Sequence, residues 1–105
     1  MRQFDLYANP DKDTNKAYPY FVDVQNDLLD TLNSRLVIPL TPVTKTDKPY
    51  PDHLCPVLKI KGKEFALLTH QTTSISVSFL KKKEGSLAGF RGEIVSAIDF
   101  LITGI

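Results

Sequence analysis

Residues 57–69, VLKIKGKEFALLT, indicate how the chain folds. Two apolar stretches flank the segment Lys61-Gly62-Lys63, which is the pattern of two strands joined by a tight turn. Gly62 supplies the permissive backbone that such a turn needs. The stretch therefore predicts a β-hairpin, and with it an antiparallel sheet.

Shorter stretches rich in apolar residues predict further strands on both sides of this hairpin. They lie at residues 3–10 (QFDLYANP), 20–25 (YFVDVQ), 35–43 (RLVIPLTPV) and 74–80 (SISVSFL). In the last of these, Ile75, Val77 and Phe79 alternate with serines, so we expect one buried and one wet face. Pro39 cannot donate a ladder hydrogen bond, so we expect its strand at a sheet edge or with a bulge.

The segments between these strands are polar. Residues 9–19 predict a loop, residues 26–34 (NDLLDTLNS) a turn or a single helical turn, residues 44–56 a long loop and residues 81–85 (KKKEG) a solvated connector. There is no internal repeat and no low-complexity segment. The chain is therefore read as one domain, residues 1–105.

From about Leu87 the apolar period becomes helical. Ile94, Ile98, Leu101 and Ile105 recur at helical spacing, with Phe90 and Ala97 on the same face. Gly104 is the expected cap at the end of this helix. Several strands followed by one helix predict a small sheet or barrel with a helix packed against it.

Composition excludes several classes of function. The net charge of +1 gives no electrostatic footprint for sequence-independent binding of nucleic acid. One cysteine allows no intramolecular disulfide, which fits a reducing compartment. No stretch is long and apolar enough to span a bilayer, so we expect a cytoplasmic protein.

Signatures of chemistry are scarce. The sequence contains no glycine-rich phosphate loop, no nucleophile elbow and no histidine spacing typical of a metal site. His53 and Cys55 are read as loop and core residues. DVQNDLLD (23–30) carries three carboxylates, but their spacing matches no calcium loop and suits turns and caps. We therefore expect no cofactor and no metal.

Two features exceed what a core requires. Leu28 and Leu29 are adjacent large apolar residues in an otherwise polar turn. The ending AIDFLITGI (97–105) is apolar beyond one buried stripe, since Phe100 lies opposite that stripe and Ile102 at its shoulder. A helix of this kind is commonly covered by a second copy of the chain or by a partner.

Three segments together resemble the CcdB family, the toxins of bacterial CcdA–CcdB toxin–antitoxin modules. They are YFVDVQNDLLD (20–30), RLVIPL (35–40) and AIDFLITGI (97–105). In them FVDVQ-x-D precedes two aliphatic residues, R-x-VIPL follows, and the final helix ends in Gly-Ile. The resemblance extends over essentially the whole chain, with a longer polar loop near residues 9–17.

The resemblance implies a homodimer with a small SH3-like barrel of the CcdB and MazF type, mainly β with one C-terminal helix (α+β). It implies a cytoplasmic toxin that binds the A subunit of DNA gyrase and traps the gyrase–DNA cleavage complex. A disordered segment of a CcdA-like antitoxin would neutralise it. Such a toxin is not an enzyme, and it contacts neither a membrane nor nucleic acid directly.

The resemblance also assigns gyrase contacts to the two unexplained features. The expected gyrase-binding residues are Leu28, Leu29, Asp30, Asp99, Ile102, Thr103, Gly104 and Ile105. The best-known members carry a Trp where this chain has Thr103. Because an indole stacked on an arginine is worth ~0.5–2 kcal/mol, its loss predicts a ~2- to 30-fold weaker complex. Asp99 stands where Asn is typical, and adds a charge that the partner must accommodate.

Two alternatives stay open. One is a degenerate homologue that folds, dimerises and binds an antitoxin without poisoning gyrase, for which Thr103 is the reason. The other is an endoribonuclease toxin of the MazF and Kid type, which needs a cationic pocket with a general acid and base. Asp23, Arg35 and His70 are candidates for that chemistry.

The antitoxin is expected to cover the loops at residues 9–17 and 43–51.

Overall fold

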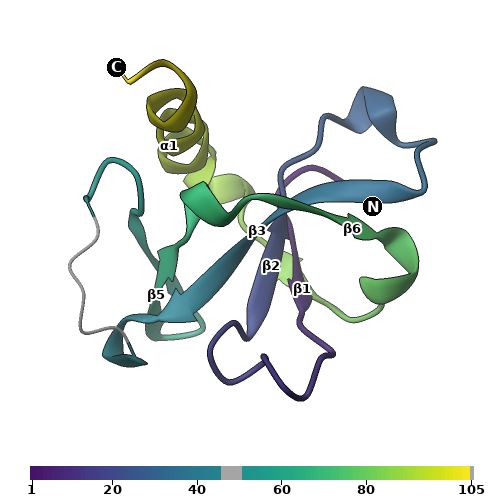
Figure 1. Cartoon of the computed structure of the whole chain (residues 1–105), viewed down its shortest axis with the longest axis horizontal. Coiled ribbons are helices and arrows are strands. Elements are labelled where there is room, and N and C mark those ends of the chain that lie inside the picture. Colours follow the sequence, from purple (N-terminus) through teal and green to yellow (C-terminus); the bar gives the residue numbers. More distant parts are fainter. Residues whose placement is uncertain (46–50, 105) are drawn as a thin grey trace.

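The computed structural model describes residues 1–45 and 51–104. Within this part of the chain the strands are β1 (Asp5–Ala8), β2 (Tyr20–Asp23), β3 (Ser34–Pro42), β4 (Val57–Ile60), β5 (Lys63–Leu67), β6 (Thr73–Ser76) and β7 (Lys83–Ser86). The helix α1 (Arg91–Thr103) follows all of them (Figure 1). Short 3-10 segments lie between these elements: η1 (Asp27–Leu29), η2 (Val43–Lys45), η3 (Thr69–Gln71), η4 (Val77–Phe79) and η5 (Ala88–Phe90).

The described strands form one sheet in which every pairing is antiparallel. Its order is β4-β5-β3-β2-β1-β7, and β6 pairs with the first half of β3. The sheet curls into a half-barrel with α1 on one side (Figure 1). A mainly β, α+β fold with a single C-terminal helix is therefore confirmed.

The hairpin predicted from residues 57–69 is present as β4 and β5. Lys61 and Gly62 form its turn, with φ angles of 52° and 82°, and Ile60 pairs with Lys63. Positive φ at both central residues is typical of a type I′ turn, whose twist matches that of the flanking strands.

Of the two placements expected for the strand of Pro39, an edge or a bulge, the edge is wrong, because β3 is an interior strand. β2 pairs along one side of β3, while β6 and then β5 share the other side. Pro39 falls between the last pair with β6, at Val37, and the first pair with β5, at Leu40. Its carbonyl accepts a hydrogen bond from the Leu68 N–H at 3.0 Å on that side. The nitrogen of Pro39, which has no N–H to donate, therefore faces the point where β3 changes partner from β6 to β5. No ladder hydrogen bond is lost there.

Two other expected boundaries are wrong. The strand expected at residues 74–80 ends at Ser76, and η4 follows because the Ser76 hydroxyl accepts from the Ser78 N–H at 3.3 Å and caps it. The expected connector at residues 81–85 contains most of β7, which pairs with β1. A lysine-bearing strand at this position closes the sheet with an edge that discourages further pairing.

The main apolar core lies between the curled sheet and α1. Its buried residues are Phe4, Leu6, Val22, Val24, Ile38, Leu40, Leu58, Ile60, Phe65, Leu67, Leu87, Ile94 and Ala97. Ile98 packs against them as expected, but Leu101 is 43% exposed. The reason is that the last turn of α1 extends beyond the sheet (Figure 1). No helix in the described part of the chain has the length and apolarity that a membrane crossing requires.

Candidate functional site

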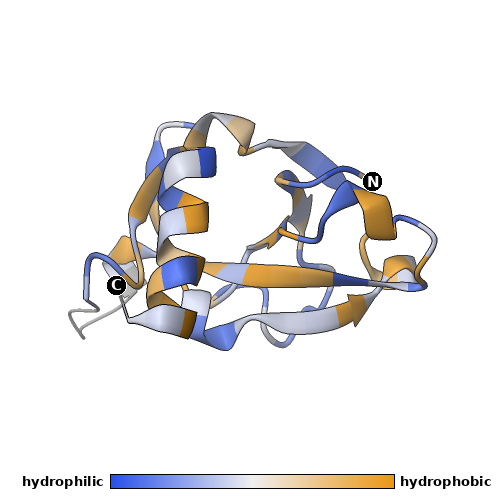
Figure 2. Ribbon diagram, turned by 90° about the horizontal axis from the view of Figure 1, so that it is seen from above, coloured by the Kyte–Doolittle hydropathy of each residue, from blue (hydrophilic) through white to orange (hydrophobic). Residues whose placement is uncertain are grey.

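The turn at residues 26–32, called here the Leu28–Leu29 turn, joins β2 to β3 and contains η1. The side chain of Asn26 caps η1 by accepting a hydrogen bond from the Leu28 N–H at 2.8 Å. Leu28 is 88% exposed and Leu29 is 49% exposed. Figure 2 shows a hydrophobic stretch at this turn, near the N-terminus. Exposed apolar side chains that adjoin one another mark a surface suited to a protein partner.

The guanidinium of Arg35, which lies in β3, is surrounded by three carboxylates. Its Nε donates to Oδ2 of Asp23 at 2.7 Å, and its Nη1 donates to Oδ1 of Asp30 at 3.3 Å. Its Nη2 lies 3.9 Å from Oδ1 of Asp27. We call these four residues the Arg35 cluster. The three carboxylates of DVQNDLLD therefore all pair with the buried guanidinium of Arg35, a role that the sequence did not reveal.

Burial and hydrogen bonding act against each other at Asp23. Its side chain is 0% exposed and that of Arg35 is 1% exposed. Burial raises the pKa of the Asp23 carboxyl, while hydrogen bonds from Arg35 and from the Gln25 N–H oppose the rise. The charged pair is preserved in the interior because both of the carboxylate oxygens have donors.

Gln25 connects the Leu28–Leu29 turn to the sheet. Its side-chain Nε2 donates to the Leu29 carbonyl at 3.0 Å, and its Oε1 accepts from the Leu36 N–H at 3.1 Å. Its own carbonyl accepts from Arg35 Nη2 at 3.4 Å. One buried carboxamide thus fixes the distance between the turn and β3.

The candidate residues for ribonuclease chemistry do not form one site. Asp23 and Arg35 are together, but both are buried and bonded to each other. His70 lies elsewhere, with its Nδ1 at 3.5 Å from the Sγ of Cys55. Cys55 is buried, which raises the pKa of its thiol, as expected of a core residue rather than a nucleophile. Over residues 1–45 and 51–104, no cluster of three or more His, Cys, Asp or Glu side chains is arranged to hold a metal.

The end of α1 forms a second exposed surface. Ile102 is 75% exposed, and Asp99 and Thr103 are also exposed. The Thr103 hydroxyl does not project freely, because it donates to the Asp99 carbonyl at 2.6 Å. Gly104 ends the helix as expected, with a φ of 76° and its N–H bonded to the Phe100 carbonyl at 2.9 Å. Ile105 lies outside the described residues.

The structure does not bring these two surfaces together in one chain. Figures 1 and 2 both show the Leu28–Leu29 turn and the end of α1 on opposite sides of the molecule, with β3 running between them. Leu28, Leu29 and Asp30 therefore form one group, and Asp99, Ile102, Thr103 and Gly104 form another.

Further apolar residues, not identified from the sequence, are exposed. Leu32 is 49% exposed, and its N–H bonds to the Leu29 carbonyl at 3.2 Å, so it continues the Leu28–Leu29 turn. Leu36 in β3 is 42% exposed and Val57 in β4 is 48% exposed. The sequence signal for Leu32 was its position in a polar turn, the same signal that identified Leu28.

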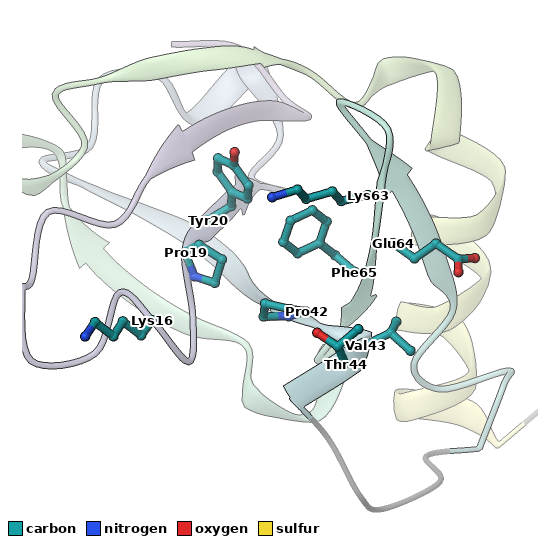
Figure 3. A pocket seen from close by; sticks show the side chains of 9 residues that line it. All are labelled: Lys16, Pro19, Tyr20, Pro42, Val43, Thr44, Lys63, Glu64 and Phe65. Carbon is teal, nitrogen blue, oxygen red and sulfur yellow. The ribbon is translucent and has the colours of Figure 1, made fainter.

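A groove of about 660 Å³ lies between β2, the end of β3 and β5. It is lined by Lys16, Pro19, Tyr20, Pro42, Val43, Thr44, Lys63, Glu64 and Phe65 (Figure 3). The rings of Tyr20 and Phe65 meet edge to face with centroids 5.3 Å apart, and the Lys61 ammonium lies 6.0 Å from the Tyr20 ring. Figure 3 shows the two rings close to each other, with Pro19 and Lys63 beside them. The lining of the groove thus combines two aromatic rings with the charged side chains of Lys16, Lys63 and Glu64.

Comparison with protein-family models gives a match over nearly the whole chain. The model described as CcdB protein matches residues 3–104. This range includes β1 to α1, and therefore both exposed surfaces and the Arg35 cluster.

Proposed function

The chain belongs to the CcdB family of toxins from toxin–antitoxin modules, and we propose that it binds the A subunit of DNA gyrase and traps the gyrase–DNA cleavage complex. The observation that carries the proposal is Leu28, which is 88% exposed on a turn anchored from inside by Arg35. An apolar side chain held in solvent is unfavourable for an isolated chain and favourable for one that docks.

The proposed gyrase contacts form two groups. The turn contributes Leu28, Leu29 and Asp30, and the end of α1 contributes Asp99, Ile102, Thr103, Gly104 and Ile105. Leu28 and Ile102 provide the apolar contact, since they are 88% and 75% exposed. Asp30 has a double role in this proposal, because it is exposed to the partner while its Oδ1 accepts from Arg35.

The proposal includes a homodimer. Leu101 leaves the last turn of α1 apolar on a side that the sheet does not cover, and a second copy would bury part of it, while Ile102 stays available to gyrase. The turn and the helix end lie apart in one chain (Figure 1), so pairing two chains increases the contact area that one gyrase dimer meets.

We place the antitoxin contact at the groove of Figure 3. Lys16 comes from the loop at residues 9–17, and Val43 and Thr44 begin the loop at residues 43–51, the two loops expected to be covered. A groove that is lined by Tyr20 and Phe65 together with Lys16 and Lys63 suits an acidic peptide that carries an aliphatic or aromatic anchor.

This function requires no catalytic group or cofactor from the chain itself. Binding to gyrase supplies the effect, and gyrase supplies the chemistry on DNA. It follows from the proposal that the protein acts in the cytoplasm, where gyrase is found.

The test is titration calorimetry of the purified chain against the purified A subunit of gyrase. Saturable binding supports the proposal, and a folded chain that does not bind gyrase contradicts it. Incubation with RNA in the absence of gyrase is the parallel control, in which the ribonuclease alternative predicts cleavage. Binding of an antitoxin peptide without binding of gyrase would identify the degenerate homologue.

A further inference from the structure

We infer that Arg35 is a positioning residue for gyrase binding: with Gln25, it holds the Leu28–Leu29 turn in the one arrangement that presents both leucines to the partner. The inference rests on the proposed function, since it concerns the same surface. Arg35 does not touch the partner in this scheme, because its side chain is 1% exposed.

The hydrogen bonds within the turn do not fix its position on the sheet. η1 is a single 3-10 turn of three residues that buries none of its side chains. Segments of this length have poor hydrogen-bond geometry and little stability of their own. Leu28 and Leu29 would gain free energy by turning toward the core, so a contact from outside the turn must oppose that movement.

Arg35 and Gln25 supply that contact from the sheet side. Arg35 reaches Asp30, just beyond η1, and Asp27 within it, while Gln25 bonds to the Leu29 carbonyl. The attachment points therefore lie on both sides of Leu28. One further bond, from the Gln3 N–H to Oδ1 of Asp27 at 2.7 Å, ties the turn to the N-terminal segment.

The charges make Arg35 hard to replace. Three carboxylates face a single guanidinium, so the Arg35 cluster carries an excess of negative charge. Without the guanidinium the carboxylates of Asp23, Asp27 and Asp30 would repel one another and open the turn. A lysine keeps the charge but has no planar fork, so it cannot bond to the buried Asp23 and to the turn at the same time.

Arg35→Lys is therefore the primary variant. Gln25→Glu is the second, because an ionised glutamate still accepts from the Leu36 N–H but cannot donate to the Leu29 carbonyl, and it adds a fourth carboxylate beside the Arg35 cluster. The matched control is Arg91→Lys, the same exchange at an exposed residue at the start of α1. Circular dichroism and thermal melting of each variant establish that it is folded.

The first readout is a double-mutant cycle on the affinity for the gyrase A subunit. We expect Arg35→Lys to weaken binding roughly ten-fold or more, and Arg91→Lys less than about two-fold. In a background of Leu28→Ala with Leu29→Ala, Arg35→Lys should weaken binding by no more than about two-fold, because only the exposed Asp30 is left to position. Equal losses in both backgrounds would overturn the inference, since they would show that Arg35 acts independently of the leucines.

The second readout needs no gyrase. Amide hydrogen exchange reports opening of the turn through the Leu29 and Leu32 N–H groups, which bond within it. We expect both to exchange roughly ten-fold faster in Arg35→Lys and Gln25→Glu, while Val37 in β3 keeps its rate. Unchanged exchange at the turn would refute the inference. If the unaltered chain does not bind gyrase, the proposed function fails, and hydrogen exchange still decides whether Arg35 holds the turn.

Discussion

Arg35 Nε lies 2.7 Å from Oδ2 of Asp23, and both side chains are shielded from solvent. Arg35 also pairs with Asp27 and Asp30, on either side of Leu28, which is the most exposed large hydrophobic residue of the described chain. The buried Asp23–Arg35 pair is costly to desolvate, and the Leu28 side chain is costly to expose to water. The buried pair thus supports the exposed side chain. Neither is explained by stability alone, and together they fit a surface that is kept ready for a partner.

Breaking this pair should destabilise the protein strongly. Arg35→Met leaves the Asp23 carboxylate buried without its cation, and we expect a loss of about 3–5 kcal/mol in the free energy of unfolding, measured with urea. Adding Asp23→Leu should recover part of that loss, because the uncompensated charge is then gone. A double variant that is less stable than Arg35→Met would contradict this interpretation.

Truncating Leu28 should separate binding from folding. Because Leu28 is 88% exposed, Leu28→Ala should change stability by no more than about 0.5 kcal/mol. The same substitution should weaken binding to the gyrase A subunit roughly ten-fold, as expected for an apolar residue at the centre of an interface. Val57→Ala is the matched control, a half-exposed apolar residue in β4 that we expect to leave affinity unchanged. Equal effects of the two variants would exclude the turn as the contact.

Replacing Thr103 with tryptophan should strengthen binding. The Thr103 hydroxyl is engaged within the helix, with its bond to the Asp99 carbonyl, so the residue offers the partner little. An indole over an arginine of the partner is worth ~0.5–2 kcal/mol, and Thr103→Trp should tighten the complex with gyrase by ~2- to 30-fold. Thr103→Val controls for loss of the hydroxyl. An unchanged affinity in Thr103→Trp would indicate that the helix end does not meet an arginine.

The free energy of unfolding should fall at alkaline pH because Tyr7 ionises more readily in the unfolded chain. Burial, together with the Asp5 and Asp23 carboxylates, raises the pKa of Tyr7 from 10.0 to about 12. The unfolded chain loses this proton near pH 10 and the folded chain near pH 12. The contribution of the protonated Tyr7 to the free energy of unfolding is therefore complete below pH 10. It is then lost as pH rises toward 12, by about 3 kcal/mol in total.

Urea unfolding of the unaltered chain and of Tyr7→Phe between pH 9 and 12 measures this effect. The unaltered chain should lose stability faster than Tyr7→Phe as pH rises, because phenylalanine has no proton to lose. Parallel pH profiles for the two proteins would show that Tyr7 ionises equally in both states.

Much of the fold could be predicted because it depends on local patterns. The hairpin of β4 and β5 follows from Gly62 between apolar stretches, and the cap at Gly104 follows from its place after a helical period. The interior position of β3 could not be predicted. Pro39 normally excludes an interior strand, and its tolerance here depends on β5 and β6 sharing one side of β3, which is a tertiary fact.

The candidate site was predictable in its apolar part. Leu28 and Ile102 stood out because each lies where an apolar residue is not needed for the core, and both are exposed. Leu101 was assigned to the core, because helical spacing does not reveal where a helix extends beyond its sheet. The Arg35 cluster was not predictable, since Asp23 and Arg35 are 12 residues apart and meet only through the pairing of β2 with β3.

The central claim is that this chain poisons gyrase, and the most direct test is a plasmid cleavage assay with purified gyrase and ATP. We expect linear DNA to accumulate after denaturation when the folded chain is present, and to be strongly reduced with Leu28→Ala. Absence of linear DNA at concentrations that saturate the gyrase A subunit would contradict the claim, and would leave a protein that binds gyrase without trapping it on DNA.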